Sequence, residues 1–251
     1  MREMRRLGFA VLMMSMMIAA CGRIVTVPKT STAVAVPAGN MLIRFRTLGP
    51  LDFNNLRYVI VFNTSGNGVQ PLPPSFAGFL NYSFELIFGG TNIGGASYAL
   101  LQIFPNGTST GYSTLSIPVQ TQFITNFNPN SSGTGNEFTF TFNRQWLNIP
   151  NPLASASPSP APSGPTPTPA PGPTLAPGQS TLWNMNFFSA DSSVANLIDA
   201  IGTNGIQDTS FTFQADTTTT FDRVISKPLP PPVQVSNTSA QIVVVEVINA
   251  P

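Results

Sequence analysis

The sequence contains no histidine, a single cysteine and few charged residues, which make up only 8% of its 251 positions. Without histidine, the chain lacks the side chain most often used for proton transfer near neutral pH, and it cannot form Ser-His-Asp or Cys-His nucleophile arrangements. Zinc sites require clusters of Cys or His, and one Cys cannot form an internal disulfide. We therefore predict a protein that is not an enzyme, with no catalytic residues, no metal and no cofactor.

The net charge is close to zero, with 11 Lys and Arg residues against 10 Asp and Glu residues. Proteins that bind nucleic acid usually carry a strongly basic surface, so nucleic acid is not an expected partner. Apolar residues, in contrast, are plentiful: 42% of the chain is hydrophobic and 19 residues are phenylalanine. This composition is sufficient for a packed core and argues against a globally disordered chain.

The N-terminus carries Arg2, Arg5 and Arg6 and is followed by an uncharged stretch over Leu7–Ala20. A transmembrane helix needs about 20 apolar residues, so this stretch is too short to span a bilayer. A basic start followed by a short apolar segment is typical of a secretory signal peptide. We predict that residues 1–20 are removed on export.

The apolar stretch ends in Ile18-Ala19-Ala20-Cys21. This segment resembles the lipobox of bacterial lipoproteins, in which an aliphatic residue and two small residues precede a cysteine; the resemblance covers only residues 1–21. It implies that the Cys21 thiol receives a diacylglyceryl group, that cleavage occurs before Cys21, and that fatty acyl chains such as palmitate anchor the protein. Two or three acyl chains hold a protein firmly in a bilayer. The alternative is an ordinary signal peptide with an incidental cysteine.

The resemblance implies a location in the bacterial cell envelope, with the exported part tethered by lipid. This would be the outer membrane of a diderm organism or the outer face of the cell membrane of a monoderm one. Gly22 rather than aspartate follows the cysteine, which by the sorting rule of well-known diderm bacteria resembles an outer-membrane lipoprotein. Residues 21–40 are expected to form a tether, with an early edge strand at Thr32–Val36.

From residue 41 onward, apolar and polar residues alternate with the period of two that is typical of β-strands. In Met41–Arg46 the alternation places Arg44 and Arg46 on the same face. Arg57–Asn63 is almost continuously apolar, which indicates a central strand. Further strands are expected at Phe79–Phe88, Ser97–Phe104, Tyr112–Ile117, Val119–Phe127, Phe138–Phe142, Leu182–Phe188, Asp208–Phe213, Thr218–Ile225 and Gln241–Ile248.

One segment, Ser192–Ile201, has the pattern of a helix. Its apolar residues fall at the i, i+3, i+4, i+7 spacing of a helix face, and Gly202 suits the position after a helix end. The expected fold is therefore all-β, an antiparallel β-sandwich of about eleven strands with one short helix.

Residues 150–178 contain 11 prolines and no charged residue. This composition excludes a helix or a central strand and favours an extended polyproline II segment. Because similar strand sequences carrying Trp146 and Trp183 flank the segment, we interpret it as a disordered insertion, an oversized hairpin loop in a single β-sandwich domain over residues 41–251. The alternative is a linker between two domains.

Four residues are candidates for ligand binding: Trp146, Trp183, Arg44 and Arg46. Exposed tryptophan rings can stack on sugars, and arginines can bind an anionic sugar or a lipid headgroup. Both residue types also serve in packing, with one or both tryptophans under the base of the proline-rich loop and the arginine stems covering a sheet face.

Carboxylates offer the remaining chemistry, because two of them can hydrolyse a glycoside without histidine. The strand-borne candidates, Glu85 and Glu137, are both expected on a solvated outer face, so a carboxylate-only glycosidase is a remote alternative. Aspartates can also contribute to a Ca²⁺ site, although no EF-hand spacing is present and most are expected to serve turns and caps. Those considered are Asp191, Asp199, Asp208, Asp216 and Asp222.

Taken together, these features predict a membrane-anchored bacterial surface lipoprotein with a non-enzymatic structural or interaction role in the envelope. Its expected partners are the lipid bilayer, through acylated Cys21, and another envelope protein or a glycan. The alternative is an extracellular glycan- or ligand-binding β-sandwich module.

Overall fold

The structure of the protein is a computed structural model. It describes residues 35–66, 79, 82–89, 98–105, 112–117, 123–149, 175–176, 178–192, 196–208 and 211–251. Cys21 and most of the proline-rich segment lie outside these ranges, as does most of the edge strand predicted at Thr32–Val36. In the described part of the chain, no helix is long and apolar enough to cross a membrane.

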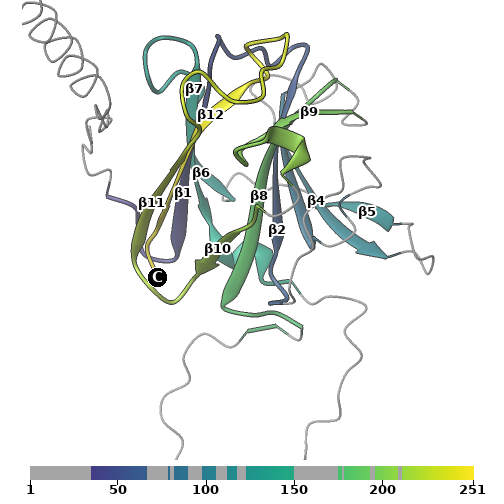
Figure 1. The fold of residues 1–251 in the computed structure, drawn as a ribbon. Helices are drawn as coiled ribbons and strands as arrows, with labels where there is room; N and C mark the ends of the chain where they lie inside the picture. Colours follow the sequence, from purple (N-terminus) through teal and green to yellow (C-terminus); the bar gives the residue numbers. More distant parts are fainter. Residues whose placement is uncertain are drawn as a thin grey trace, which may run out of the picture. The chain divides into compact units, whose positions relative to one another are not determined.

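Two antiparallel sheets pack face to face, which confirms the predicted all-β sandwich (Figure 1). The five-stranded sheet has the order β11-β12-β1-β7-β6; the seven-stranded sheet has the order β10-β8-β2-β3-β4-β5, with β9 paired to β8. The strands are β1 (Asn40–Thr47), β2 (Arg57–Asn63), β3 (Phe84–Phe88), β4 (Tyr98–Pro105), β5 (Tyr112–Ile117), β6 (Ile124–Asn128), β7 (Glu137–Asn143), β8 (Leu182–Ala190), β9 (Leu197–Ala200), β10 (Phe213–Asp216), β11 (Phe221–Ser226) and β12 (Ile242–Asn249). Within the described ranges, the helical elements are two 3₁₀ turns, η1 (Arg144–Leu147) and η2 (Gly205–Gln207).

Strand β1 lies in the middle of the five-stranded sheet, hydrogen-bonded to β12 and β7. Ile43 and Phe45 are fully buried toward the other sheet, and Ile43 stands opposite Phe140 of β7. Arg44 and Arg46 alternate with them and lie on the opposite face, as the period of two predicts. The amphipathic pattern of β1 therefore fixes which face of this sheet meets the core.

Strand β2 lies between β8 and β3 and is buried along its whole length, which confirms the prediction of a central strand. One face carries Tyr58, Ile60 and Phe62 into the core between the sheets. The other face carries Val59 and Val61 into a second apolar cluster. A strand with apolar neighbours on both faces has no polar side, so its sequence shows a continuous apolar run instead of an alternation.

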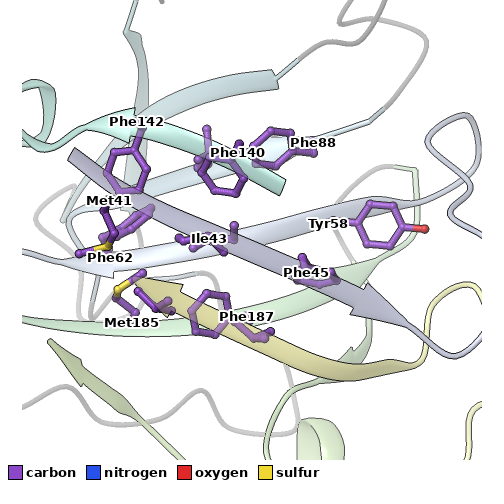
Figure 2. Close-up of a cluster of buried hydrophobic side chains, with 14 of the residues drawn as sticks. Met41, Ile43, Phe45, Tyr58, Phe62, Phe88, Phe140, Phe142, Met185 and Phe187 are labelled. Atoms are coloured by element: carbon purple, nitrogen blue, oxygen red, sulfur yellow. The ribbon is translucent and has the colours of Figure 1, made fainter. Parts of the chain in front are cut away.

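Aromatic rings fill much of the space between the sheets (Figure 2). The rings of Phe138, Phe140 and Phe142 follow one another along β7, with centroid separations of 6.2 and 5.9 Å. Phe88 of the opposite sheet lies 4.6 Å from Phe140 and 5.0 Å from Phe138. Each such pair contributes about 0.5–1.5 kcal/mol beyond the burial of apolar area. The FTFTF pattern of β7 thus supplies one wall of the core.

The proline-rich segment joins the two sheets, because β7 before it belongs to the five-stranded sheet and β8 after it to the seven-stranded sheet. It is therefore not the hairpin loop that the flanking sequences suggested. Strands from both sides of the segment contribute to both sheets, and residues 36–251 group into one compact unit. The two ends of the segment are hydrogen-bonded together: the amide N–H of Ala176 donates to Asn148 Oδ1 (2.9 Å), and Gln179 Nε2 donates to the Ile149 carbonyl (2.7 Å).

The helix predicted over Ser192–Ile201 is wrong where the structure describes it, because Leu197–Ala200 forms strand β9. This strand pairs with the part of β8 near Ala190, along the same side of β8 that β10 occupies near its start. Pairing with β9 provides hydrogen-bond partners for backbone groups of β8, which a local helix would have left without them. In a short segment, such pairing between distant parts of the chain outweighs a helical pattern of apolar residues.

Truncation of Phe140 to alanine should lower the free energy of unfolding by about 3–5 kcal/mol, because it removes a ring in contact with both neighbouring phenylalanines of β7 and with Phe88. The matched control is Val224→Ala, at a side chain that is 53% exposed on β11, where a loss below about 1 kcal/mol is expected. Urea unfolding followed by tryptophan fluorescence measures both. Equal losses for the two variants would contradict the packing described here.

Candidate functional site

The two arginines proposed for ligand binding lie on the outer face of the five-stranded sheet, where β1 places them beside carboxylates of both neighbouring strands. Arg44 stands opposite Glu246 of β12 in the register, and its Nη1 lies 2.5 Å from Glu246 Oε2. Arg46 stands opposite Glu137 of β7, and its Nε donates to Glu137 Oε2 at 2.7 Å. The two residues are thus held in an ion-pair network, which an anionic ligand would have to displace.

Glu137 joins the two halves of this network. Its Oε1 lies 3.5 Å from Arg44 Nε and accepts a hydrogen bond from Ser131 Oγ at 2.8 Å, while its Oε2 binds Arg46. The side chain is 4% exposed, so the expectation of a solvated position was wrong. Two long arginine side chains cover the carboxylate, which the sequence of β7 alone does not reveal.

Glu246 is the second buried carboxylate of the network. Burial raises the pKa of its carboxyl group, the positive charge of Arg44 opposes this rise, and the negative charges of Asp222 and Glu137 add to it. We refer to the group on the outer face of the five-stranded sheet as the charged cluster. It contains two guanidinium groups and three carboxyl groups, those of Arg44, Arg46, Glu137, Glu246 and Asp222.

The two tryptophans do not lie in equivalent positions. Trp183 is 5% exposed, packs edge-on against Phe62 with a centroid separation of 6.2 Å, and donates its indole N–H to the Ser180 carbonyl at 3.0 Å. Its ring is part of the core and offers no open face for stacking on a sugar. Trp146 lies in η1, half-buried against the core, and its Nε1 is buried without a hydrogen-bond partner in the described part of the chain.

Glu85 was also expected to be solvated, and it is instead 3% exposed. It lies on β3 between Val61 of β2 and Leu101 of β4 in the register, on the side of the seven-stranded sheet that carries the second apolar cluster. Phe79 and Tyr82 belong to that cluster. The expectation failed because the outer face of this sheet is itself covered by apolar side chains.

Burial raises the pKa of Glu85 to about 8. Its Oε1 has no hydrogen-bond partner among the residues that the structure describes. A buried carboxyl group without a cationic partner favours the protonated form, because transfer of the charge out of water is not compensated. This raised pKa favours the protonated form of Glu85 at neutral pH.

Sequence reasoning missed a buried ion pair between Asp199 and Lys227. Lys227 Nζ donates to Asp199 Oδ1 at 2.7 Å and to Oδ2 at 2.8 Å, and both side chains are 1% exposed. Asp199 lies in β9 of the seven-stranded sheet, whereas Lys227 follows β11 and its N–H donates to Val243 of β12 in the five-stranded sheet. The pair thus connects the two sheets.

A signal for this contact was present in the sequence. Asp199 interrupts the apolar run Leu197-Ile198-Asp199-Ala200-Ile201, and a charge in such a run requires a partner if it is buried. The helical interpretation hid this requirement, because it allowed Asp199 to be placed on a solvated helix face. The partner, Lys227, could not be identified from the sequence, since it is 28 residues away.

The other aspartates considered for calcium lie on separate elements. Asp191 Oδ2 accepts a hydrogen bond from Asn196 Nδ2 at 2.6 Å. Asp216 Oδ1 accepts bonds from the backbone N–H and the hydroxyl of Thr218, and these bonds lower the pKa of Asp216. These are turn contacts of the kind expected from the sequence. Among the described residues, no group of three or more His, Cys, Asp or Glu side chains could hold a metal ion.

Comparison with known proteins returns no relative: no protein-family model, no curated protein and no solved structure matches the chain.

Replacement of Glu85 by glutamine should change how stability depends on pH. The folded-state pKa of Glu85 is about 8, above its usual value of 4.5, so the folded protein holds the proton more tightly than the unfolded chain. The wild type therefore loses stability as pH rises between these two values, by about 1.4 kcal/mol per pH unit from this group. Glu85→Gln does not titrate, so its stability relative to wild type should rise over that interval and level off above pH 8.

Urea unfolding of both proteins at a series of pH values from 4 to about 9 measures this difference, because groups common to both proteins cancel. A difference that does not vary with pH would contradict a Glu85 carboxyl group whose pKa is raised by burial.

Proposed function

We propose that the protein is an exported lipoprotein of the bacterial cell envelope, tethered through acylated Cys21, in which the β-sandwich has a structural or interaction role. The observation that carries this proposal is the position of Ile18-Ala19-Ala20-Cys21 directly after an apolar segment and ahead of the sandwich, whose first strand begins at Asn40. The order of signal, acylation site, tether and folded domain is what a lipid-anchored protein requires.

A tether at one end of the sandwich would leave the opposite end available to a partner. The Gly39 N–H donates to the Ala250 carbonyl (2.9 Å), and the Ala250 N–H donates to the Asn40 carbonyl (3.1 Å), so the chain enters the sandwich beside its C-terminal end. The antiparallel registers of β1 with β7 and β12 place the connections after Thr47 and before Ile242 at the opposite end. A tether attached at Asn40 therefore leaves that opposite end farthest from the point of attachment.

Exposed apolar side chains occur at this far end. Leu48, directly after β1, is 43% exposed, and Leu229, two residues after Lys227, is 69% exposed. The backbone at Leu48 is held by hydrogen bonds: the N–H groups of Leu48 and Gly49 donate to the carbonyls of Gln241 and Thr238, respectively.

The contacts made by three of the residues proposed for ligand binding favour a structural role for their side chains. Trp183 is packed in the core, and Arg44 and Arg46 are engaged by Glu137 and Glu246. These contacts favour the envelope role over the glycan-binding alternative, which depended on an exposed aromatic surface.

Acylation is tested by growing bacteria that express the full chain with an alkyne analogue of palmitate. The wild-type protein should incorporate the label and partition into the detergent phase of Triton X-114, whereas Cys21→Ala should do neither, because it lacks the thiol that receives the lipid. In-gel fluorescence after coupling to an azide dye measures the incorporation.

Gly22→Ala is the matched control, since it changes the neighbouring residue but keeps the thiol, and it should be labelled as strongly as wild type. A wild-type protein without label, or equal label on Cys21→Ala, would refute the lipid anchor.

A further inference from the structure

The pair formed by Asp199 and Lys227 has the contacts of a reactive site as well as those of an ion pair. Lys227 Nζ lies 2.7 and 2.8 Å from the two carboxyl oxygens of Asp199, so the nitrogen stands directly beside the carboxyl carbon that they flank. The main-chain N–H of Ile242 donates to Asp199 Oδ2 at 2.8 Å and holds the carboxyl group in place. Nitrogen and carbon are thereby fixed at close range by three hydrogen bonds.

The surroundings exclude water from this contact. Both side chains are 1% exposed. Gly205 of η2 has φ +60°, and a Cβ at this position would lie 2.7 Å from Asp199 Oδ1 and 4.0 Å from Lys227 Nζ. The backbone of η2 therefore closes over the pair so tightly that only glycine fits there.

Burial also favours the neutral form of the pair, in which the proton lies on Asp199 instead of Lys227. Burial raises the pKa of Asp199, and it lowers the pKa of Lys227; the mutual attraction of the two charges opposes both changes, and for Lys227 the nearby charge of Asp208 does so as well. Transfer of one proton from Nζ to the carboxylate yields an amine and a carboxylic acid. An uncharged amine is a nucleophile, and a protonated carboxyl group can lose its hydroxyl as water.

We propose that Asp199 and Lys227 are a modification site at which the two side chains condense into an intramolecular amide bond that joins the two sheets. The proposal does not depend on the lipid anchor, since it concerns residues of the sandwich alone.

The condensation needs no reagent other than the two side chains. After the proton transfer, the Nζ lone pair attacks Cγ of Asp199 and forms the N–C bond. A second proton moves from the nitrogen to the carboxyl hydroxyl, the C–O bond breaks, and one water molecule leaves; no atom is oxidised or reduced. The Ile242 N–H at Oδ2 is placed to stabilise the negative charge that develops on this oxygen during attack. A rotation about the Cβ–Cγ bond of Asp199 presents the face of the carboxyl group to the nitrogen.

The close contact between the Lys227 amine and the Asp199 carboxyl group favours the reaction. The hydrogen bonds keep the amine next to the carboxyl group, so that only a rotation of this group precedes attack, and such proximity lowers the entropic barrier of a reaction that is slow in free solution. The bond would link residues 28 positions apart. It would also provide the covalent connection between strands that a chain with one cysteine cannot obtain from a disulfide.

Peptide mass spectrometry of the full chain purified from bacterial cells tests the proposal. Proteolysis of the wild-type protein should yield a branched peptide containing Asp199 and Lys227, lighter by one water molecule than the sum of the two linear peptides, and fragmentation should locate the bond at these two residues. Recovery of both peptides in linear form at full mass, or location of the water loss at any other residue, would overturn the proposal and leave the contact an ion pair.

Two variants sharpen the result. Lys227→Arg keeps the positive charge but replaces the reactive amine with a guanidinium, so the branched peptide should disappear. Asp199→Asn should give a branched peptide of the same mass as wild type, because attack on the amide releases ammonia and forms an identical bond. A branched species that persists in Lys227→Arg would likewise overturn the assignment.

Discussion

The packing of phenylalanine rings between the two sheets is the interaction on which the rest of this structure depends. The chain has one cysteine and only 8% charged residues, so neither disulfides nor surface ion pairs supply much of its stability, and surface pairs contribute at most about 1 kcal/mol each. The rings of β7 meet those of the opposite sheet at centroid separations down to 4.6 Å. Apolar burial of this kind must therefore provide most of the favourable free energy.

The polar groups are arranged around this constraint in three ways. Arg44, Arg46 and their glutamate partners lie on the outer face of the five-stranded sheet, where the arginine side chains cover the carboxylates. Glu85 has no cationic partner among the described residues, and burial within the second apolar cluster raises its pKa and favours its neutral form. Asp199 and Lys227 are enclosed between the sheets, where loss of one partner would cost about 3–5 kcal/mol because it leaves an uncompensated buried charge. The last arrangement constrains how the sheets sit on each other far more than the first.

Most strands could be predicted from the sequence because a period of two reports directly which side chains face the core, as in β1, and a continuous apolar run reports burial on both faces, as in β2. The failures share one cause, which is that periodicity describes a single strand and its two faces but not what covers them. Glu85 and Glu137 alternate with core residues, yet one is covered by a second apolar layer and the other by arginine stems. The four residues of β9 were too few to distinguish a strand from a helix, and the sheet edge that captured them is set by β8.

The proposed tether would give the architecture a mechanical meaning. Under the proposed anchoring through Cys21, a load between the membrane and a partner at the far end would enter the sandwich at Asn40 and act along β1. Because β1 is paired on both sides, with β12 and β7, such a load stretches the two hydrogen-bond ladders in shear, so their bonds resist together rather than opening one at a time from an edge. An edge strand at this position would instead peel away. The contact between Asp199 and Lys227 then holds the seven-stranded sheet to the loaded one, so that the force is shared by both layers. A central first strand and a buried contact between the sheets would thus both resist a load on the domain, if it is held by one end as proposed.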